Sequence, residues 1–185
     1  LNRHENFEIT QTFYSQAVDN AILQVTQEND AIAFENVNGG LVMQGSETEI
    51  GWHASDSLYI KGFVSIAEYT FGNNADNPGN SLPGTPNFSG GLQVNSIQEW
   101  GLVNLRARYV GETPLNNEGT VLMDEYTVID VSASRKIHKN STIEMGIRNL
   151  LDDKYSDWPQ LNGVYGKFYN PAPPRTIYVS LRASI

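Results

Sequence analysis

The loop 156–174, together with Arg175 directly after it, carries the side chains best suited to binding a ligand. Aromatic rings stack on flat or apolar ligands, and cations attract anionic ones. The alternative is structural, because long loops usually fold around their own aromatic side chains. We expect ligand binding in an external loop here, with packing against a rim as the alternative. The candidate residues are Trp158, Tyr165, Lys167, Phe168, Tyr169 and Arg175.

Other reactive residues are poorly arranged for catalysis. The adjacent Asp152 and Asp153, and the pair Glu47 and Glu49, suggest a carboxylate dyad or a calcium site. Acidic residues at loop entrances are, however, ordinary turn chemistry, and nothing else indicates a sugar-cleaving cleft. The histidines lack the spacing of zinc ligands, and there is no cysteine. We expect no enzyme, no metal site and no cofactor.

Composition narrows the class of protein further. The 185 residues suffice for one domain, and 21 acidic against 12 basic residues give a formal net charge of -9. This excess argues against a nucleic-acid partner, which needs a basic face. No apolar run predicts a transmembrane helix, but this test does not detect strands that alternate apolar and polar residues. A start at Leu1 without a signal peptide suggests a processed product or a piece of a longer protein.

The elements that must position these residues are predicted to be mostly β-strands, because apolar and polar residues alternate along most segments. In the final segment Ile177, Val179 and Leu181 alternate with polar residues, which gives a strand one apolar face. Each predicted strand is long enough for the roughly 9–11 residues that a tilted strand needs to cross a bilayer. The eight predicted strands span 5–25, 40–54, 57–71, 86–96, 100–112, 124–137, 141–151 and 174–185.

The connections alternate between short and long. Tight polar turns lie near 54–57, 96–99 and 138–140. Long antiparallel strands with tight turns on one side and long loops on the other are typical of an outer-membrane β-barrel. Such a sheet must close, because hydrocarbon satisfies no backbone hydrogen bonds. The long Gly-, Asn- and Pro-rich loops are 26–39, 72–86, 112–124 and 152–174.

Aromatic residues near both ends of the strands suggest the two interfacial girdles of such a barrel. A soluble antiparallel sandwich also alternates apolar and polar residues, although its strands are usually only about five or six residues long. The expected girdles are Trp52, Tyr59 and Trp100 on the turn side, and Tyr69, Phe71, Tyr109 and Tyr126 on the loop side.

Four arginines fall on the polar faces of the predicted strands, where they would face the lumen of a barrel. One interpretation is a charged path for a solute. The other is a set of ion pairs with Glu47, Glu49, Glu112 and Glu144. The lumen-facing arginines are Arg106, Arg108, Arg148 and Arg182.

Three motifs in order resemble the C-terminal end of TonB-dependent outer-membrane receptors. The strand 126–134 is followed by MGIRNLLDDKY at 145–155 and by PPRTIYVSLR at 173–182. The family pattern is a strand ending in NL-(F/L)-D-K-Y, a long external loop, and a closing strand that opens with PPR or GR. Upstream, 34–37 and 45–49 are similar to the N-(V/A)…G-x-E hairpin of the family, so the match covers roughly 30–185.

The resemblance implies a barrel of about 22 strands, plugged by an N-terminal globular domain. It implies a location in the bacterial outer membrane, contact with the lipid bilayer, coupling to the TonB complex through that plug, and uptake of a ligand that is most often a ferric siderophore. Residues 1–185 would be the C-terminal part of the barrel. Family members generally end in an aromatic residue, whereas this chain ends in Ile185.

Two alternatives stay open. One is a self-contained eight-stranded outer-membrane barrel, in which 5–25 pairs with 174–185. The other is a soluble β-sandwich binding module. If the chain is part of a larger barrel, it has two unpaired edges, and we predict that it does not fold stably by itself.

Overall fold

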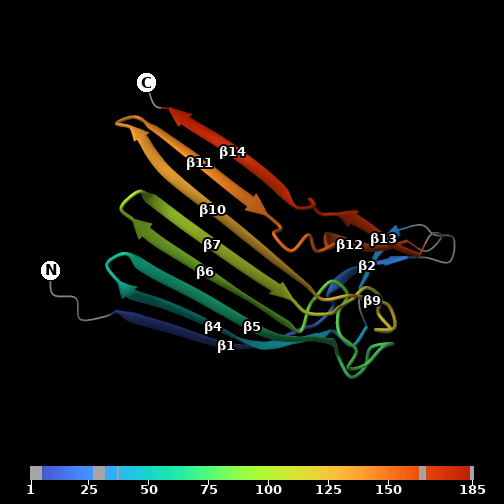
Figure 1. Cartoon of the computed structure of the whole chain (residues 1–185). Coiled ribbons are helices and arrows are strands. Elements are labelled where there is room, and N and C mark those ends of the chain that lie inside the picture. The colour runs from blue at the N-terminus through green and yellow to red at the C-terminus, as the bar shows by residue number, and fades with distance from the viewer. Residues whose placement is uncertain (1–5, 27–31, 37, 163–165, 184–185) are drawn as a thin grey trace.

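The computed structural model describes residues 6–26, 32–36, 38–162 and 166–183. Eight long strands form one antiparallel sheet in the order β1-β4-β5-β6-β7-β10-β11-β14 (Figure 1). None of the described residues forms a helix long and apolar enough to cross a membrane. The strands are β1 (Phe7–Val18), β4 (Leu41–Ser55), β5 (Leu58–Phe71), β6 (Phe88–Gln98), β7 (Gly101–Val110), β10 (Tyr126–His138), β11 (Ser141–Arg148) and β14 (Thr176–Ala183).

Each predicted strand corresponds to one long strand of the sheet, but the loops contain structure that the sequence did not reveal. The predicted strand 5–25 is too long, because the backbone leaves the sheet at Asn20, which has a φ of 55°. The chain then forms a short hairpin at the loop end. The short paired strands are β2 (Ile22–Thr26) with β3 (Ile32–Asn36), β8 (Thr113–Pro114) with β9 (Leu122–Met123), and β12 (Ser156–Asn162) with β13 (Gly166–Pro171).

The two ends of the sheet differ as predicted. The tight turns at 56–57, 99–100 and 139–140 lie at one end, together with the start of β1 and the end of β14. The short hairpins and the long connection 72–87 lie at the other end, which we call the loop end (Figure 1).

The strand registers separate one apolar face from one polar face. The apolar face includes Ile60, Leu105, Met145 and Val179. No second layer of protein covers it within the described residues: Ile177, Val179 and Leu181 are 75%, 62% and 66% exposed. A soluble protein does not leave so large an apolar surface uncovered, whereas lipid covers it in a membrane. The soluble-sandwich hypothesis is therefore wrong.

Charged residues avoid the middle of the apolar face. In the paired registers of the described strands, the two charged residues on this face are Glu68, near the loop end of β5, and Arg135, near the turn end of β10. Gln44 Nε2 donates a 2.6 Å hydrogen bond to the Glu68 carboxylate. Both charges therefore lie where a bilayer would present its polar interfaces.

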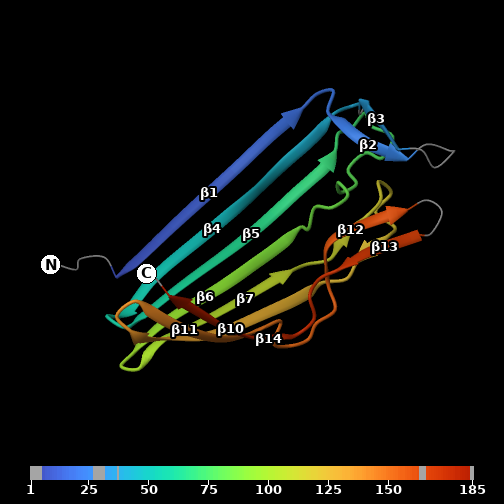
Figure 2. The same ribbon diagram turned by 90° about the horizontal axis from the view of Figure 1, so that it is seen from above.

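The sheet is open. β1 pairs only with β4, and β14 pairs only with β11, so the described residues contain no contact that closes a barrel. Figure 2 shows the sheet from above as a curved surface with β1 and β14 at its edges. The self-contained eight-stranded barrel is therefore wrong, because that hypothesis required these two strands to pair.

The girdle prediction is only partly correct, because position along a strand does not determine which face a side chain takes. Trp52 and Tyr109 lie on the apolar face, and Trp100 is half exposed in a tight turn. Phe88 packs on Tyr109 with ring centroids 5.7 Å apart, which gives a loop-side aromatic pair on the apolar face. The residues that lie on the polar face instead are Tyr59, Tyr69, Phe71 and Tyr126.

Candidate functional site

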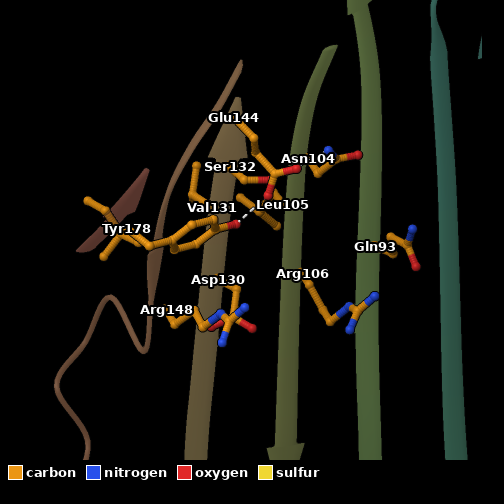
Figure 3. Close-up of a pocket in the computed structure, with 11 residues that line it drawn as sticks. Gln93, Asn104, Leu105, Arg106, Asp130, Val131, Ser132, Glu144, Arg148 and Tyr178 are labelled. Atoms are coloured by element: carbon orange, nitrogen blue, oxygen red, sulfur yellow. Dashed lines mark hydrogen bonds between the residues drawn. The ribbon is translucent and has the colours of Figure 1, made fainter. Parts of the chain in front are cut away.

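A hollow of about 300 Å³ opens on the polar face, where β6, β7, β10, β11 and β14 lie side by side (Figure 3). Pairing places its residues in rows across the strands: Gln93 lies opposite Arg106, and Arg106 lies opposite Asp130. The side chains that define it are Gln93, Asn104, Arg106, Asp130, Arg148 and Tyr178.

Tyr178 reaches across the hollow because its neighbour in β11 is a glycine. A Cβ atom at Gly146 would lie 2.5 Å from Tyr178 Cε1, so only glycine lets the ring lie flat over the strand. The Tyr178 hydroxyl donates a 2.6 Å hydrogen bond to Glu144 Oε1. The guanidinium of Arg148 lies 5.0 Å from the centroid of the same ring.

Both carboxylates of the hollow are already hydrogen-bonded. Asp130 Oδ1 accepts the backbone N–H of Asn149 at 2.9 Å, and Glu144 accepts the Tyr178 hydroxyl. In contrast, Arg106 and Arg148 form no ion pair within 4.0 Å with any described residue.

The predicted arginine–glutamate ion pairs are wrong for the part of the chain that the structure describes. Glu49 pairs with Lys61 at 2.7 Å, which lies one strand away on the same face. Arg108 pairs with Asp157 instead of a glutamate. None of the four arginines pairs with Glu47, Glu49, Glu112 or Glu144 within the described residues, and Glu144 instead accepts a hydrogen bond from the Tyr178 hydroxyl. All four lie on the polar face of the sheet: Arg106, Arg108, Arg148 and Arg182.

Arg108 fastens the β12–β13 hairpin to the sheet. Its Nη2 donates to Asp157 Oδ1 at 3.1 Å. The guanidinium also lies 5.5 Å from the ring centroid of Tyr126 and 5.8 Å from that of Tyr155, and these rings stack with centroids 4.7 Å apart. Burial raises the pKa of the Tyr155 hydroxyl. This cluster joins the segment after β11 to the wall formed by β7 and β10.

Asn149, from the motif RNLLDDKY, organises the end of β11. Its side chain is 2% exposed, and its φ of 50° is tolerated by asparagine. Its Nδ2 donates to the backbone oxygens of Asp153 at 2.9 Å and Pro173 at 3.3 Å, while its Oδ1 accepts the N–H of Asp153 at 3.0 Å. The motif therefore ties the turn after β11 to the start of the closing strand.

The candidate ligand residues are described only in part. The Arg175 guanidinium donates to Asp152 Oδ2 at 3.2 Å, and its backbone N–H donates to Asp152 Oδ1 at 2.9 Å. The backbone hydrogen bond, and then the guanidinium, lower the pKa of Asp152. Arg175 thus already has a carboxylate partner. The backbone of Trp158 lies in β12, and that of Lys167, Phe168 and Tyr169 in β13, but their side chains lie outside the described residues, as does all of Tyr165.

Sequence reasoning missed the roles of Asp130, Asp157 and Asn149. Alternation along 126–134 places Asp130 on the polar face, so that signal was available. The Asp157–Arg108 contact spans 49 positions in the sequence and depends on how the hairpin folds back, for which there was no local signal. Among the described residues there is no group of three or more side chains that could hold a metal ion.

Comparisons with known proteins agree with this architecture. The family model for the TonB dependent receptor-like β-barrel matches residues 2–150. The ferric yersiniabactin uptake receptor FyuA from Yersinia pestis is 18% identical with a TM-score of 0.81, and the alignment covers 96% of this chain and 27% of that one. The siderophore receptor PiuA from Acinetobacter baumannii is 17% identical with a TM-score of 0.77 over 95% of this chain and 26% of that one.

The fold does not by itself select one cargo. The copper transporter OprC is 15% identical with a TM-score of 0.78, over 99% of this chain and 30% of that one. The chain thus spans between about a quarter and a third of the length of these solved structures. Because the family model matches well over half of the chain, the chain belongs to the TonB-dependent receptor-like β-barrel family of outer-membrane proteins.

Proposed function

We propose that residues 1–185 form the C-terminal part of the barrel of a TonB-dependent receptor that takes up a ferric siderophore. The observation that carries this proposal is the open sheet with one lipid-compatible face and one polar face. An open edge is a template for further strand pairing, so β1 and β14 require neighbouring strands. Strands from the remainder of a longer polypeptide would supply them.

The length of the strands supports a sheet that spans a membrane as part of a barrel wall. β4 has 15 residues, and at about 3.3 Å per residue such a strand is roughly 50 Å long. Tilted by about 45°, it covers more than the hydrocarbon core of a bilayer. The apolar face would contact lipid, and the polar face would line the lumen.

The β12–β13 hairpin supports ligand capture at the outer end. Arg108, Asp157 and the Tyr126–Tyr155 stack hold its base against the wall. This base would present Trp158, Tyr165, Lys167, Phe168 and Tyr169 from one loop, with Arg175 beside it. Rings and cations of this kind suit an anionic ferric complex with an aromatic or apolar body. Coupling to the TonB complex would pass through a plug outside this chain.

Uptake by cells tests the cargo. The full-length receptor would be expressed in bacteria lacking their own receptors, with and without a functional TonB complex. Radioactive iron would be supplied as a ferric catecholate, a ferric hydroxamate or ferric citrate, beside labelled vitamin B12, a glycan and copper. We expect TonB-dependent accumulation of one ferric complex. Uptake of vitamin B12, a glycan or copper in its place would refute the siderophore assignment.

Point variants test the loop. Trp158→Ala and Lys167→Gln should weaken binding of the ferric complex to intact cells, whereas Lys139→Gln, in a tight turn at the opposite end, is the matched control. Equal binding by all three variants and the wild type would remove the loop from the proposal.

A further inference from the structure

The apolar face is not uniform across the eight strands. One row of paired residues on this face is apolar in every strand, from Phe7 in β1 to Ile177 in β14. Nearer the loop end of β1, β4 and β5, which lie side by side at one edge of the sheet (Figure 1), the same face carries a group of polar side chains. We call these residues the outward polar strip: Gln11, Ser15, Gln44, Ser46, Thr48 and Glu68.

The outward polar strip satisfies only part of its own hydrogen-bonding capacity. Thr48 Oγ1 donates to Gln11 Oε1 at 2.5 Å, and Gln44 Nε2 donates to the Glu68 carboxylate at 2.6 Å. A glutamine amide has two N–H donors and a carbonyl acceptor, so these bonds leave part of each amide without a partner among the described residues. The hydroxyls of Ser15 and Ser46 form no hydrogen bond with a described residue.

The strip lies at a depth where lipid cannot satisfy it. Trp52 lies on this face near the turn end of β4, and Thr48, Ser46 and Gln44 lie four, six and eight positions from it. At about 3.3 Å per residue and a tilt of about 45°, they lie roughly 9, 14 and 19 Å from Trp52 along the membrane normal. The apolar band of an outer-membrane barrel is about 25 Å tall, so Thr48 and Ser46 fall inside it. Acyl chains would leave the remaining amide and hydroxyl groups unsatisfied, which is unfavourable.

We propose that the outward polar strip binds the same strip of a second copy of the receptor in the plane of the membrane. Two copies in one membrane have the same orientation, so a two-fold axis along the membrane normal brings identical surfaces together. Amide and hydroxyl groups both donate and accept, which makes the strip complementary to itself in hydrogen bonding. The one charged residue of the strip, Glu68, lies at its loop end and already accepts a hydrogen bond from Gln44.

The shape of the strip also fits a copy of itself. Phe13 is 78% exposed and lies opposite the small residue Ser46 in the register. A large ring beside small residues gives a projection next to a low area, and a two-fold axis places the ring of one copy against the low area of the other. Small residues let the two surfaces approach closely, as they do between membrane helices. The inference goes beyond the proposed function, because it depends on the membrane location of the family and not on the cargo.

Disulfide cross-linking of the full-length receptor in the outer membrane tests this contact. Residues 1–185 contain no cysteine, and any cysteine elsewhere in the polypeptide would first be replaced by serine. Ser46→Cys places a thiol at the centre of the strip, and Ala133→Cys, on the same face in β10, is the matched control. Cells would be treated with the membrane-permeant oxidant copper phenanthroline. Non-reducing electrophoresis and mass spectrometry would then give the amount and the composition of each cross-linked product.

A second copy on the strip should give roughly tenfold more receptor dimer for Ser46→Cys than for Ala133→Cys, because a specific contact holds the two thiols near each other. Equal yields in the two variants would overturn the proposal, since chance collisions explain them. No dimer from Ser46→Cys, as expected if lipid alone covers the strip, would also overturn it. So would a product in which Ser46→Cys is joined to a different protein.

A second set of variants tests whether the polar groups hold the two copies together. In the Ser46→Cys receptor, Gln11→Leu combined with Thr48→Val removes hydrogen-bonding groups from the strip at nearly constant volume. The dimer yield should then fall by roughly fivefold, since each hydrogen bond within a membrane contributes modestly. Thr127→Val, on the same face in β10, is the matched control and should leave the yield unchanged. If the yield stays the same in both, the polar groups do not make the contact and the proposal fails.

Discussion

The arginines at the loop end of the polar face form ion pairs, whereas those in the hollow within the sheet form none with a described residue. At the loop end Arg108 pairs with Asp157, and Arg175 pairs with Asp152. In the hollow, Arg106 and Arg148 lack a carboxylate partner among the described residues. The same residue type therefore holds a hairpin at the loop end, whereas in the hollow it forms no ion pair with a described residue.

The largest effect should come from the loop end, at Asn149. Asn149→Ala removes three side-chain hydrogen bonds from a buried site and leaves backbone groups of Asp153 and Pro173 without these partners. We expect a loss of about 3 kcal/mol in the free energy of unfolding, measured by denaturation of the full-length receptor.

Asn104→Ala is the matched control for this prediction. Asn104 lines the hollow and has a single long hydrogen bond, 3.5 Å to Ser132. It should cost less than about 0.5 kcal/mol. Equal losses in both variants would contradict the contrast between the two regions.

A smaller effect is expected at the floor of the hollow. In Gly146→Ala the new methyl group collides with the Tyr178 ring, which must move and weaken its bond to Glu144. We expect a loss of about 1–2 kcal/mol in the same denaturation measurement. Gly62→Ala is the control, because its Cβ would meet only Gly91 O at 3.8 Å. If Gly62→Ala is as damaging, the contact with the ring is not the cause.

The Arg108 contact should contribute less to stability. Asp157→Asn removes an ion pair whose side chains are 43% and 56% exposed, so we expect only about 0.5 kcal/mol. The more sensitive measurement is the rate of limited proteolysis in the hairpin 156–171, which should rise. Asp124→Asn, also exposed at the loop end, should leave that rate unchanged.

The smallest expected effect concerns pH. Folding lowers the pKa of Asp152 below its ordinary value of 3.8, because the charged form accepts hydrogen bonds from the backbone and the guanidinium of Arg175. The contact therefore stabilises the folded state above pH 3.8 and loses this contribution as the pH falls through the lower folded value. The difference in unfolding temperature between wild type and Asp152→Asn should shrink with acidification over that range. A constant difference would refute the assignment.

The sequence predicted the sheet better than the site. A period of two follows directly from having one apolar face, so Ile177, Val179 and Leu181 were placed correctly on one side of β14. The girdle prediction was wrong for Tyr69 and Tyr126, because closeness to a strand end does not determine whether a side chain lies on the apolar or the polar face. The role of Asn149 depends on Pro173, 24 positions away, and no local pattern encodes that contact.

The order of the strands in the sheet affects how the protein tolerates insertions and deletions in the connections between strands. Each inner strand of the large sheet pairs with the long strands that precede and follow it along the chain, and the edge strands β1 and β14 each pair with one such neighbour. The topology contains no crossover, so each register depends on its own two neighbours rather than on distant segments. Lengthening a connection adds only a small, logarithmic entropy cost. Insertions and deletions at the loop end can therefore accumulate independently of one another while the wall keeps its pairing.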